Sequence, residues 1–525
     1  MTGQEAERQQ LRDYQTQCLE QAKSENIILH LGTGLGKTLV ALRLIEHYLE
    51  RQENKLAVII VPTVVIVEQH AKSCREQIGI GDARKKCPRV LEIAGNNQAG
   101  WSREDWLQAI DDHDIFVSTP DIFRKALVTN GYLRVDNFSV IVFDECHHAI
   151  NAGSMATILH DAVHCDVRHG PPRVLGLTAS FVKGGLGNAA NDRRQMEMLF
   201  HARFVCPDVE SQSKPKPRRI AYGNDMQHTK EDVLKLKQLL SVALGEVLIE
   251  IKDMKKAINQ CTEVFKELGR ESLVYYVKNI VKQIEYRISQ LQDMEEQKVK
   301  DHAAKMAERL PILKRSIESL KTSLFNSGLL ENQTSPRTSK LERLLTLLQE
   351  RFDANTNNGF CGIVFVAEVS LVPTLAKQLN DGLSGAKCGG VTGGSAQSMS
   401  DRRENIDAFR KGHYRLLVAT AALEEGIDVP QCRFAVQFSK SKTTKSIIQT
   451  LGRVRHVNAE HYYFENNPEI EKHKVERLVA FARDSSLSLS AEERSKAPKK
   501  NAGNNQTSLS IQAVREVLGR CRKYL

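Results

Sequence analysis

The sequence predicts an α/β protein with two parallel-sheet domains, an all-helical insertion between them and further helices near the C-terminus. Three observations support this prediction. Two stretches of the chain alternate short β-branched runs with amphipathic helical patterns, and the segment between them has a helical pattern only. The length of 525 residues also exceeds one ordinary hydrophobic core, which favours several domains.

The strands are predicted from short apolar runs that suit burial on both faces of a parallel sheet. The first stretch contains five such runs, at residues 26–30, 56–62, 114–119, 139–145 and 173–180. The second stretch contains four, at residues 361–367, 386–393, 414–420 and 434–439. Helical patterns separate the runs, so we expect parallel strands joined by helices in both domains.

The segment between the two stretches is predicted to be all-helical. Its apolar residues recur every three or four positions from Val233 to Phe265, and glycine is almost absent from it. After the second domain, another helical pattern covers 468–483, and a polar stretch that cannot bury a core follows it. The expected organisation is a first domain at 1–224, the insertion at 225–335, a second domain at 336–466, helices at 467–489, a linker at 490–508 and the start of another domain at 509–525.

Composition narrows the functional classes. The longest apolar runs fall far short of the roughly 20 residues of a membrane helix, and the polar start resembles no secretory signal. Eleven cysteines without a Cys-x-x-Cys pair suggest neither a zinc site nor a disulfide framework, so we expect a reducing, cytoplasmic location and no membrane partner. The net charge of +10 is compatible with a polyanionic partner.

The stretch LGTGLGKT, residues 31–38, has the context of a phosphate-binding loop because it follows a predicted strand and opens a predicted helix. Gly34 and Gly36 would let backbone N–H groups approach phosphates, Lys37 would reach the β- and γ-phosphates, and Thr38 would ligate Mg²⁺. Leu31 stands where the general pattern has its first glycine. The alternative is a glycine-rich turn that binds nothing.

Two acidic residues end the fourth predicted strand. Asp144 can hold Mg²⁺ through water, and Glu145 can orient an attacking water molecule. The alternative is that both residues are ordinary solvated acids, which are common at strand ends. The phosphate-loop candidate upstream makes this alternative less favoured. A zinc site at Cys146, His147 and His148 is disfavoured because the ligand spacing and a fourth ligand are missing.

Seven stretches of the sequence resemble the motifs of a known family. The stretches LGTGLGKT, VPTVVIVEQ, VSTPDIF, DECHHA, LGLTAS, LLVATAALEEGIDVP and QTLGRVRH occur in the order found in superfamily-2 RNA helicases, and the DECH form resembles the Dicer and RIG-I-like receptor group. The resemblance covers residues 8–485, and EEGIDVPQC and CGIVFVAEVS look closer to Dicer. It implies two RecA-like domains and a helical pincer at 468–483 that ties the insertion to the second domain.

The resemblance also implies a role for individual residues. ATP binding would involve Arg12 and Gln15 of LRDYQ together with Gly426 and Asp428 of EEGIDVP. Catalysis would involve Lys37, Asp144 and Glu145 with Gln449, Arg453 and Arg455, the arginines stabilising charge on the γ-phosphate. His147, Thr178 and Ser180 would couple hydrolysis to RNA contact. The RNA groove would include Pro62, Thr63, Gln69, Thr119, Thr392, Gly393 and Thr420.

The favoured function is therefore an ATP- and Mg²⁺-dependent, double-stranded-RNA-stimulated ATPase of a Dicer-like protein, acting in RNA interference or antiviral defence. We expect a monomer that binds duplex RNA and dsRNA-binding accessory proteins. Hydroxyl and backbone contacts would read A-form shape rather than base sequence. Three alternatives remain open: a RIG-I-like sensor, a duplex-binding module without hydrolysis, and a DNA-translocating helicase.

Overall fold

The computed structural model of the chain describes thirteen main stretches. These are residues 9–51, 55–79, 87–151, 153–164, 171–209, 216–223, 230–245, 251–292, 337–355, 360–392, 399–420, 432–440 and 459–495, apart from 96–97, 99 and 183–184. Isolated positions between 304 and 322 and residues 397, 443 and 448 are also described. In this part of the chain, no helix combines the length and apolar character needed to cross a membrane.

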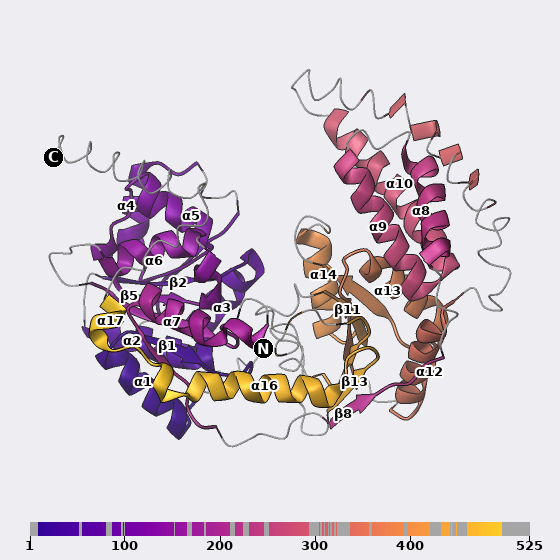
Figure 1. Cartoon of the computed structure of the whole chain (residues 1–525). Helices are drawn as coiled ribbons and strands as arrows, with labels where there is room; N and C mark the ends of the chain where they lie inside the picture. Colours follow the sequence, from indigo (N-terminus) through magenta and orange to yellow (C-terminus); the bar gives the residue numbers. More distant parts are fainter. Residues whose placement is uncertain are drawn as a thin grey trace, which may run out of the picture.

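A seven-stranded sheet forms the centre of the first domain (Figure 1). Its strand order is β3-β4-β2-β5-β6-β1-β7, and all neighbouring strands are parallel. The strands are β1 Ile27–His30, β2 Leu56–Ile60, β3 Val90–Ile93, β4 Ile115–Ser118, β5 Phe138–Phe143, β6 Arg173–Thr178 and β7 Arg203–Val205. The five strands predicted in this stretch are confirmed, whereas β3 and β7 were not predicted.

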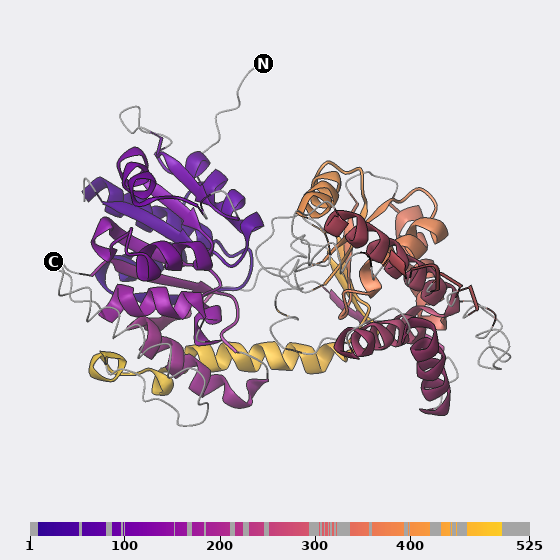
Figure 2. The ribbon, with the colours of Figure 1, turned by 90° about the horizontal axis from the view of Figure 1, so that it is seen from above.

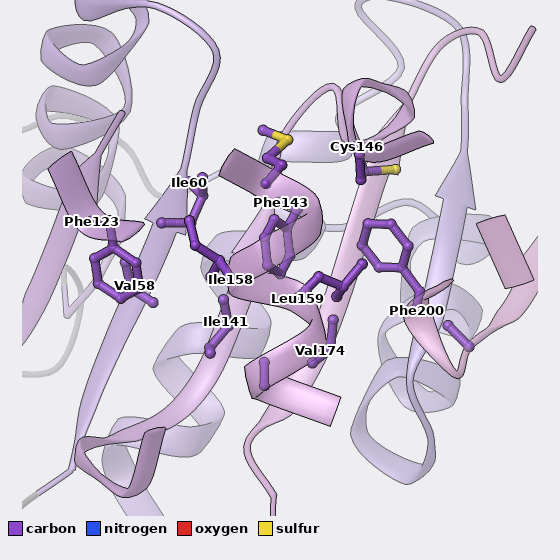
Figure 3. Close-up of a cluster of buried hydrophobic side chains, with 14 of the residues drawn as sticks. Val58, Ile60, Phe123, Ile141, Phe143, Cys146, Ile158, Leu159, Val174 and Phe200 are labelled. Atoms are coloured by element: carbon purple, nitrogen blue, oxygen red, sulfur yellow. The ribbon is translucent and has the colours of Figure 1, made fainter. Parts of the chain in front are cut away.

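Helices cover both faces of this sheet, because the strands are buried on both sides. They are α1 Asp13–Ser24, α2 Lys37–Arg51, α3 Val64–Gln77, α4 Arg103–Asp112, α5 Pro120–Arg124, α6 Ser154–His164 and α7 Ala189–Phe200. One face of the sheet packs against α6 through a core that includes Ile141, Phe143, Ile158, Leu159 and Phe200 (Figure 3). Cys146 lies in the same core and is fully buried.

The second domain is built on a six-stranded sheet of order β10-β11-β9-β12-β13-β8, again with parallel neighbours. Its strands are β8 Lys216–Arg219, β9 Gly362–Phe365, β10 Cys388–Val391, β11 Leu416–Ala419, β12 Phe434–Gln437 and β13 Glu460–Tyr463. The helices of this domain are α12 Ser339–Asp353, α13 Leu371–Gly382 and α14 Met399–Arg410. The four strands predicted in this stretch are confirmed.

One strand of the second sheet comes from early in the chain. β8 pairs with β13, with Lys216 opposite Glu460 and Arg219 opposite Tyr463, although its residues precede the insertion. The expected range 1–224 for the first domain therefore includes a strand of the second sheet. Its sequence, KPRR, has no apolar residue except proline, so it carries no strand pattern.

Three helices form the described part of the insertion: α8 Lys230–Gly245, α9 Ile251–Leu268 and α10 Arg270–Gln292. Their shared core contains Leu236, Leu240, Ile258, Cys261 and Phe265, all members of the predicted apolar stripe. Val264 and Leu268 of α9 belong instead to the core of the second domain. The insertion is thereby packed against α12 and α13, and Figure 1 shows it projecting from the second domain.

A long helix, α16 Pro468–Arg483, bridges the two domains (Figures 1 and 2). It follows β13 of the second sheet, and its Leu478 and Ala482 enter the core of the first domain. Arg193 of α7 holds the far end by donating to the carbonyl oxygens of Phe481 at 2.8 Å and Asp484 at 2.7 Å. The prediction that this helix ties the insertion to the second domain stays a prediction, and its described contacts tie the second domain to the first. A short helix, α17 Ala491–Ser495, follows it.

Candidate functional site

The carboxyl ends of the parallel strands of the first sheet bring the predicted nucleotide residues to one edge. The phosphate-loop candidate follows β1, Asp144 and Glu145 follow β5, and Thr178 ends β6. The order β5-β6-β1 makes these strands neighbours. Ligands of open α/β sheets bind at this edge, so the topology places the candidate residues where a nucleotide would be expected.

The loop after β1 has the backbone that its glycines permit. Gly34 has φ 81° and Gly36 has φ 82°, both in the left-handed region that other residues adopt only with strain. A Cβ atom on Gly36 would also lie 2.1 Å from Nε2 of Gln15, so glycine is required here for space as well. Lys37 is the first residue of α2, and its Nζ donates to the carbonyl oxygen of Leu31 at 2.9 Å.

Leu31 occupies the position of the missing first glycine without distorting the loop. Its side chain is 2% exposed and belongs to the core beneath the sheet. Its backbone N–H donates to the carbonyl oxygen of Thr178 at 3.1 Å, which continues the pairing of β1 with β6. The residue therefore acts as the last core position of the strand, and the turn begins after it.

Gln15 lies directly against the loop. Its Nε2 donates to the carbonyl oxygen of Leu35 at 2.9 Å, and its Oε1 accepts from the backbone N–H of Arg12 at 2.8 Å. The hydroxyl of Tyr14 donates to the same Leu35 oxygen at 2.9 Å. The start of α1 and the phosphate-loop candidate are thereby held together, while the Arg12 side chain is exposed beside them.

Asp144 is buried, and both oxygens of its side chain accept hydrogen bonds. Its Oδ2 accepts from Nε2 of His70 at 2.9 Å, and its Oδ1 accepts from the backbone N–H of Glu145 at 3.0 Å. Burial acts to raise the pKa of Asp144, but the His70 hydrogen bond and the charges of His70 and Lys37 outweigh it and hold that pKa below its usual range. The lowered pKa favours the carboxylate form of Asp144 at the strand end next to the phosphate-loop candidate.

Glu145 adopts a strained backbone, with φ 46° in the left-handed region. Such a conformation costs about 1–3 kcal/mol and tends to persist at functional sites. Its Oε2 is buried and receives no hydrogen bond from the described residues, although Nδ1 of His147 lies 3.3 Å away. This carboxylate oxygen therefore lies within ion-pair distance of His147.

The three coupling candidates form a connected group. Nδ1 of His147 lies 3.1 Å from the hydroxyl of Thr178, and that hydroxyl donates to the carbonyl oxygen of Ser180 at 2.6 Å. The Ser180 hydroxyl is buried and has no hydrogen-bond partner among the described residues. The Asp144–Glu145 turn is therefore linked through His147 to the end of β6.

Mg²⁺ fits this donor set better than zinc does. Among the described residues, no group of three or more His, Cys, Asp or Glu side chains could hold a metal ion. Magnesium is usually bound by one or two protein oxygens together with substrate phosphates, and Thr38 and Asp144 supply such oxygens beside the loop. The zinc alternative at Cys146, His147 and His148 gains no support from the described geometry.

Most of the predicted groove residues lie at the same edges of the two sheets. Pro62 and Thr63 follow β2, Gln69 lies on α3, and Thr119 begins α5 after β4. In the second sheet, Thr392 follows β10 and Thr420 follows β11, where the N–H of Thr420 donates to the carbonyl oxygen of Val391 at 3.4 Å. The Thr392 hydroxyl is buried without a hydrogen-bond partner among the described residues.

Six predicted site residues lie outside the described residues: Gly393, Gly426, Asp428, Gln449, Arg453 and Arg455. Their predicted roles stay predictions. Conversely, sequence reasoning missed His70, the partner of Asp144. A signal was available, because His70 falls among the buried positions Ile66, Val67, Ala71 and Cys74 of α3, where a histidine needs a polar partner.

Comparison with known families defines the class of protein. The family described as the res subunit of type III restriction enzymes matches residues 8–183, and the helicase conserved C-terminal domain matches residues 339–458. Together with the two parallel-sheet domains, these matches identify a helicase-type, nucleotide-dependent enzyme with two RecA-like domains.

The curated relatives of this chain include Dicer and Dicer-like proteins. Protein Dicer of Schizosaccharomyces pombe is 28% identical over 89% of this chain and 35% of its own length. Endoribonuclease Dicer homolog 2b of Oryza sativa subsp. japonica is 27% identical over 88% of this chain and 35% of its own. Dicer-like protein 2 of Emericella nidulans is 26% identical over 85% and 31%. The chain is similar to these Dicer and Dicer-like proteins over most of its own length and spans about a third of theirs.

Among solved structures, the helicase domain of Pyrococcus furiosus Hef aligns with 88% of this chain and 97% of that chain. The TM-score is 0.48 and the sequence identity is 20%.

Proposed function

We propose that this chain is a double-stranded-RNA-stimulated ATPase, the helicase module of a Dicer-like protein, which couples ATP hydrolysis to clamping of or translocation on duplex RNA in RNA interference or antiviral defence. The observation that carries the proposal is that buried Asp144, held by His70 and a backbone N–H, lies at the same sheet edge as Lys37 of the phosphate-loop candidate. The similarity to Dicer proteins supports duplex RNA as the partner.

The chain's own residues divide the reaction between them. Lys37 and the loop N–H groups would hold the terminal phosphates, while Thr38 and Asp144 would hold Mg²⁺, which would neutralise charge on those phosphates. Glu145 orients the attacking water through its carboxylate, which His147 contacts. Arg453 and Arg455 of the second domain approach the γ-phosphate, so that hydrolysis requires the two domains to close.

RNA stimulation follows from the same arrangement. The groove candidates lie on both sheets: Thr63 and Thr119 on the first, Thr392 and Thr420 on the second. A duplex that contacts both domains favours the closed state, and so does ATP, because each ligand bridges them. The two ligands must then raise each other's affinity by the same factor.

Steady-state ATP hydrolysis with no nucleic acid, duplex RNA, single-stranded RNA and duplex DNA tests this proposal. We expect duplex RNA to raise kcat/KM for ATP most strongly. Equal stimulation by duplex DNA would support the DNA-translocating alternative instead. Tight duplex-RNA binding without measurable hydrolysis would support the binding-only module.

A further inference from the structure

α3 Val64–Gln77 joins three regions of the molecule. Its start follows the groove candidate Thr63, which occupies the N-cap position but makes no side-chain capping hydrogen bond. Val65 packs against the core of the second domain, and Glu68 forms an ion pair with Arg403 of α14. His70 comes two residues after Glu68, which is about half a helical turn, and it contacts Asp144.

His70 is built into the site rather than lying beside it. Its side chain is 3% exposed, and its Nε2 lies 2.9 Å from Oδ2 of Asp144. The residues are 74 positions apart in sequence, and α3 and β5 are joined here by a buried hydrogen bond. Nδ1 of His70 has no hydrogen-bond partner among the described residues, so Asp144 is the polar group that satisfies this ring.

The two hydrogen bonds to Asp144 fix the plane of its carboxylate. Oδ1 is held by the N–H of Glu145 and Oδ2 by His70, yet an ionised carboxylate has about four acceptor positions and can still bind a metal-coordinated water. Groups that orient a metal-ligating carboxylate in this way contribute strongly to metal affinity, typically about 10–100-fold. Without His70, one oxygen of a buried carboxylate would lose its partner.

We propose that His70 is a positioning residue: it holds Asp144 in the orientation that Mg²⁺ requires and ties that orientation to α3, the helix whose start lines the RNA groove. RNA contact at Thr63 and the ion pair between α3 and the second domain then influence the orientation of Asp144, because α3 carries all of these contacts. The inference rests on the proposed nucleotide site, but it assigns a role to a residue outside the predicted motif positions.

His70→Leu is the first test, because leucine fills the space without offering a donor. We expect the Mg²⁺ concentration for half-maximal binding of a fluorescent ADP to rise by about 10–100-fold. This binding measurement does not depend on hydrolysis, so it separates failure of the inference from failure of the proposed ATPase. Stimulation of hydrolysis by duplex RNA should fall in the same variant.

His70→Gln is the rescue variant, since its amide nitrogen can donate to Asp144 from a position near that of Nε2. In this variant, the Mg²⁺ concentration for half-maximal ADP binding should return close to the wild-type value. The variant also keeps the inference testable if the leucine variant fails to fold. His113→Ala is the matched control, because His113 ends α4 just before β4, at the opposite edge of the same sheet. It should leave the Mg²⁺ dependence unchanged.

A purely structural role predicts a different pattern. In that case His70→Leu would lower the melting temperature measured without nucleotide and leave the Mg²⁺ dependence of ADP binding at the wild-type value. That result, or equal Mg²⁺ dependence in the leucine and glutamine variants, would overturn the inference.

Discussion

The two sheets share a topology but carry different chemistry at the edge where their strands end. In the first sheet this edge holds Lys37, Asp144 and Glu145, with a buried charge and a strained backbone. In the second sheet, the described residues that follow β10 and β11 are Thr392 and Thr420. The first edge is equipped to hold charged phosphates and metal, whereas the second offers hydroxyl groups suited to a sugar–phosphate backbone.

Under the proposed function, this difference means that neither domain could hydrolyse ATP alone. A nucleotide held by the first domain still lacks the predicted arginines, which belong to the second. The structure joins the domains by α16, anchored on Arg193, and by the ion pair between Glu68 and Arg403. The exposed ion pair contributes little stability by itself, so closure should depend on ligands that touch both domains.

The substitution with the largest expected effect on ATP hydrolysis lies in the first domain. Lys37→Ala should abolish ATP hydrolysis, because it removes the charge that positions the terminal phosphates. Steady-state turnover and the melting temperature would be measured together, and the fold should remain intact because Lys37 is only partly buried.

Lys23→Ala is the matched control for this variant. Lys23 ends α1 just before β1, so it lies at the opposite edge of the sheet. Unchanged turnover in Lys37→Ala would refute the phosphate-loop assignment.

The second domain should affect the reaction through its transition state. Arg453→Ala or Arg455→Ala should lower kcat by about 10³ or more while changing ATP affinity much less, as expected for a guanidinium delivered from the opposite domain. Arg410→Ala, an exposed arginine of α14 paired with Asp407, is the control and should have no such effect. A rise in KM at constant kcat would show that these arginines are ordinary binding contacts.

The sequence predicts the parts of the fold that carry an apolar pattern, and fails where no such pattern exists. The buried strands β1, β2, β5 and β6 were identified because most of their residues are apolar. β8 could not be found, because Lys216, Pro217 and two arginines form an edge strand held by backbone bonds to β13. Its place in the second sheet depends on a long-range pairing that local patterns do not encode.

Some residues of the candidate site could likewise be predicted from local sequence patterns, and others could not. Motif spacing predicted the loop, Asp144 and Glu145, because short stretches fix those positions relative to each strand end. The contact between His70 and Asp144 joins residues 74 positions apart, so no local spacing reveals it. Nor does the sequence show that Leu31 replaces a glycine harmlessly, since this depends on a core beneath the sheet.

The central claim is that ATP and duplex RNA favour the same closed arrangement of two unlike domains. Glu145→Gln tests it most directly, because the amide keeps the size of the side chain but loses the carboxylate that orients water, so bound ATP should persist. Duplex-RNA affinity of this variant would be measured by filter binding at fixed salt, with and without ATP·Mg²⁺. We predict tighter RNA binding with ATP, by the roughly 1–3 kcal/mol typical of such coupling. RNA affinity that is identical with and without ATP would contradict the account.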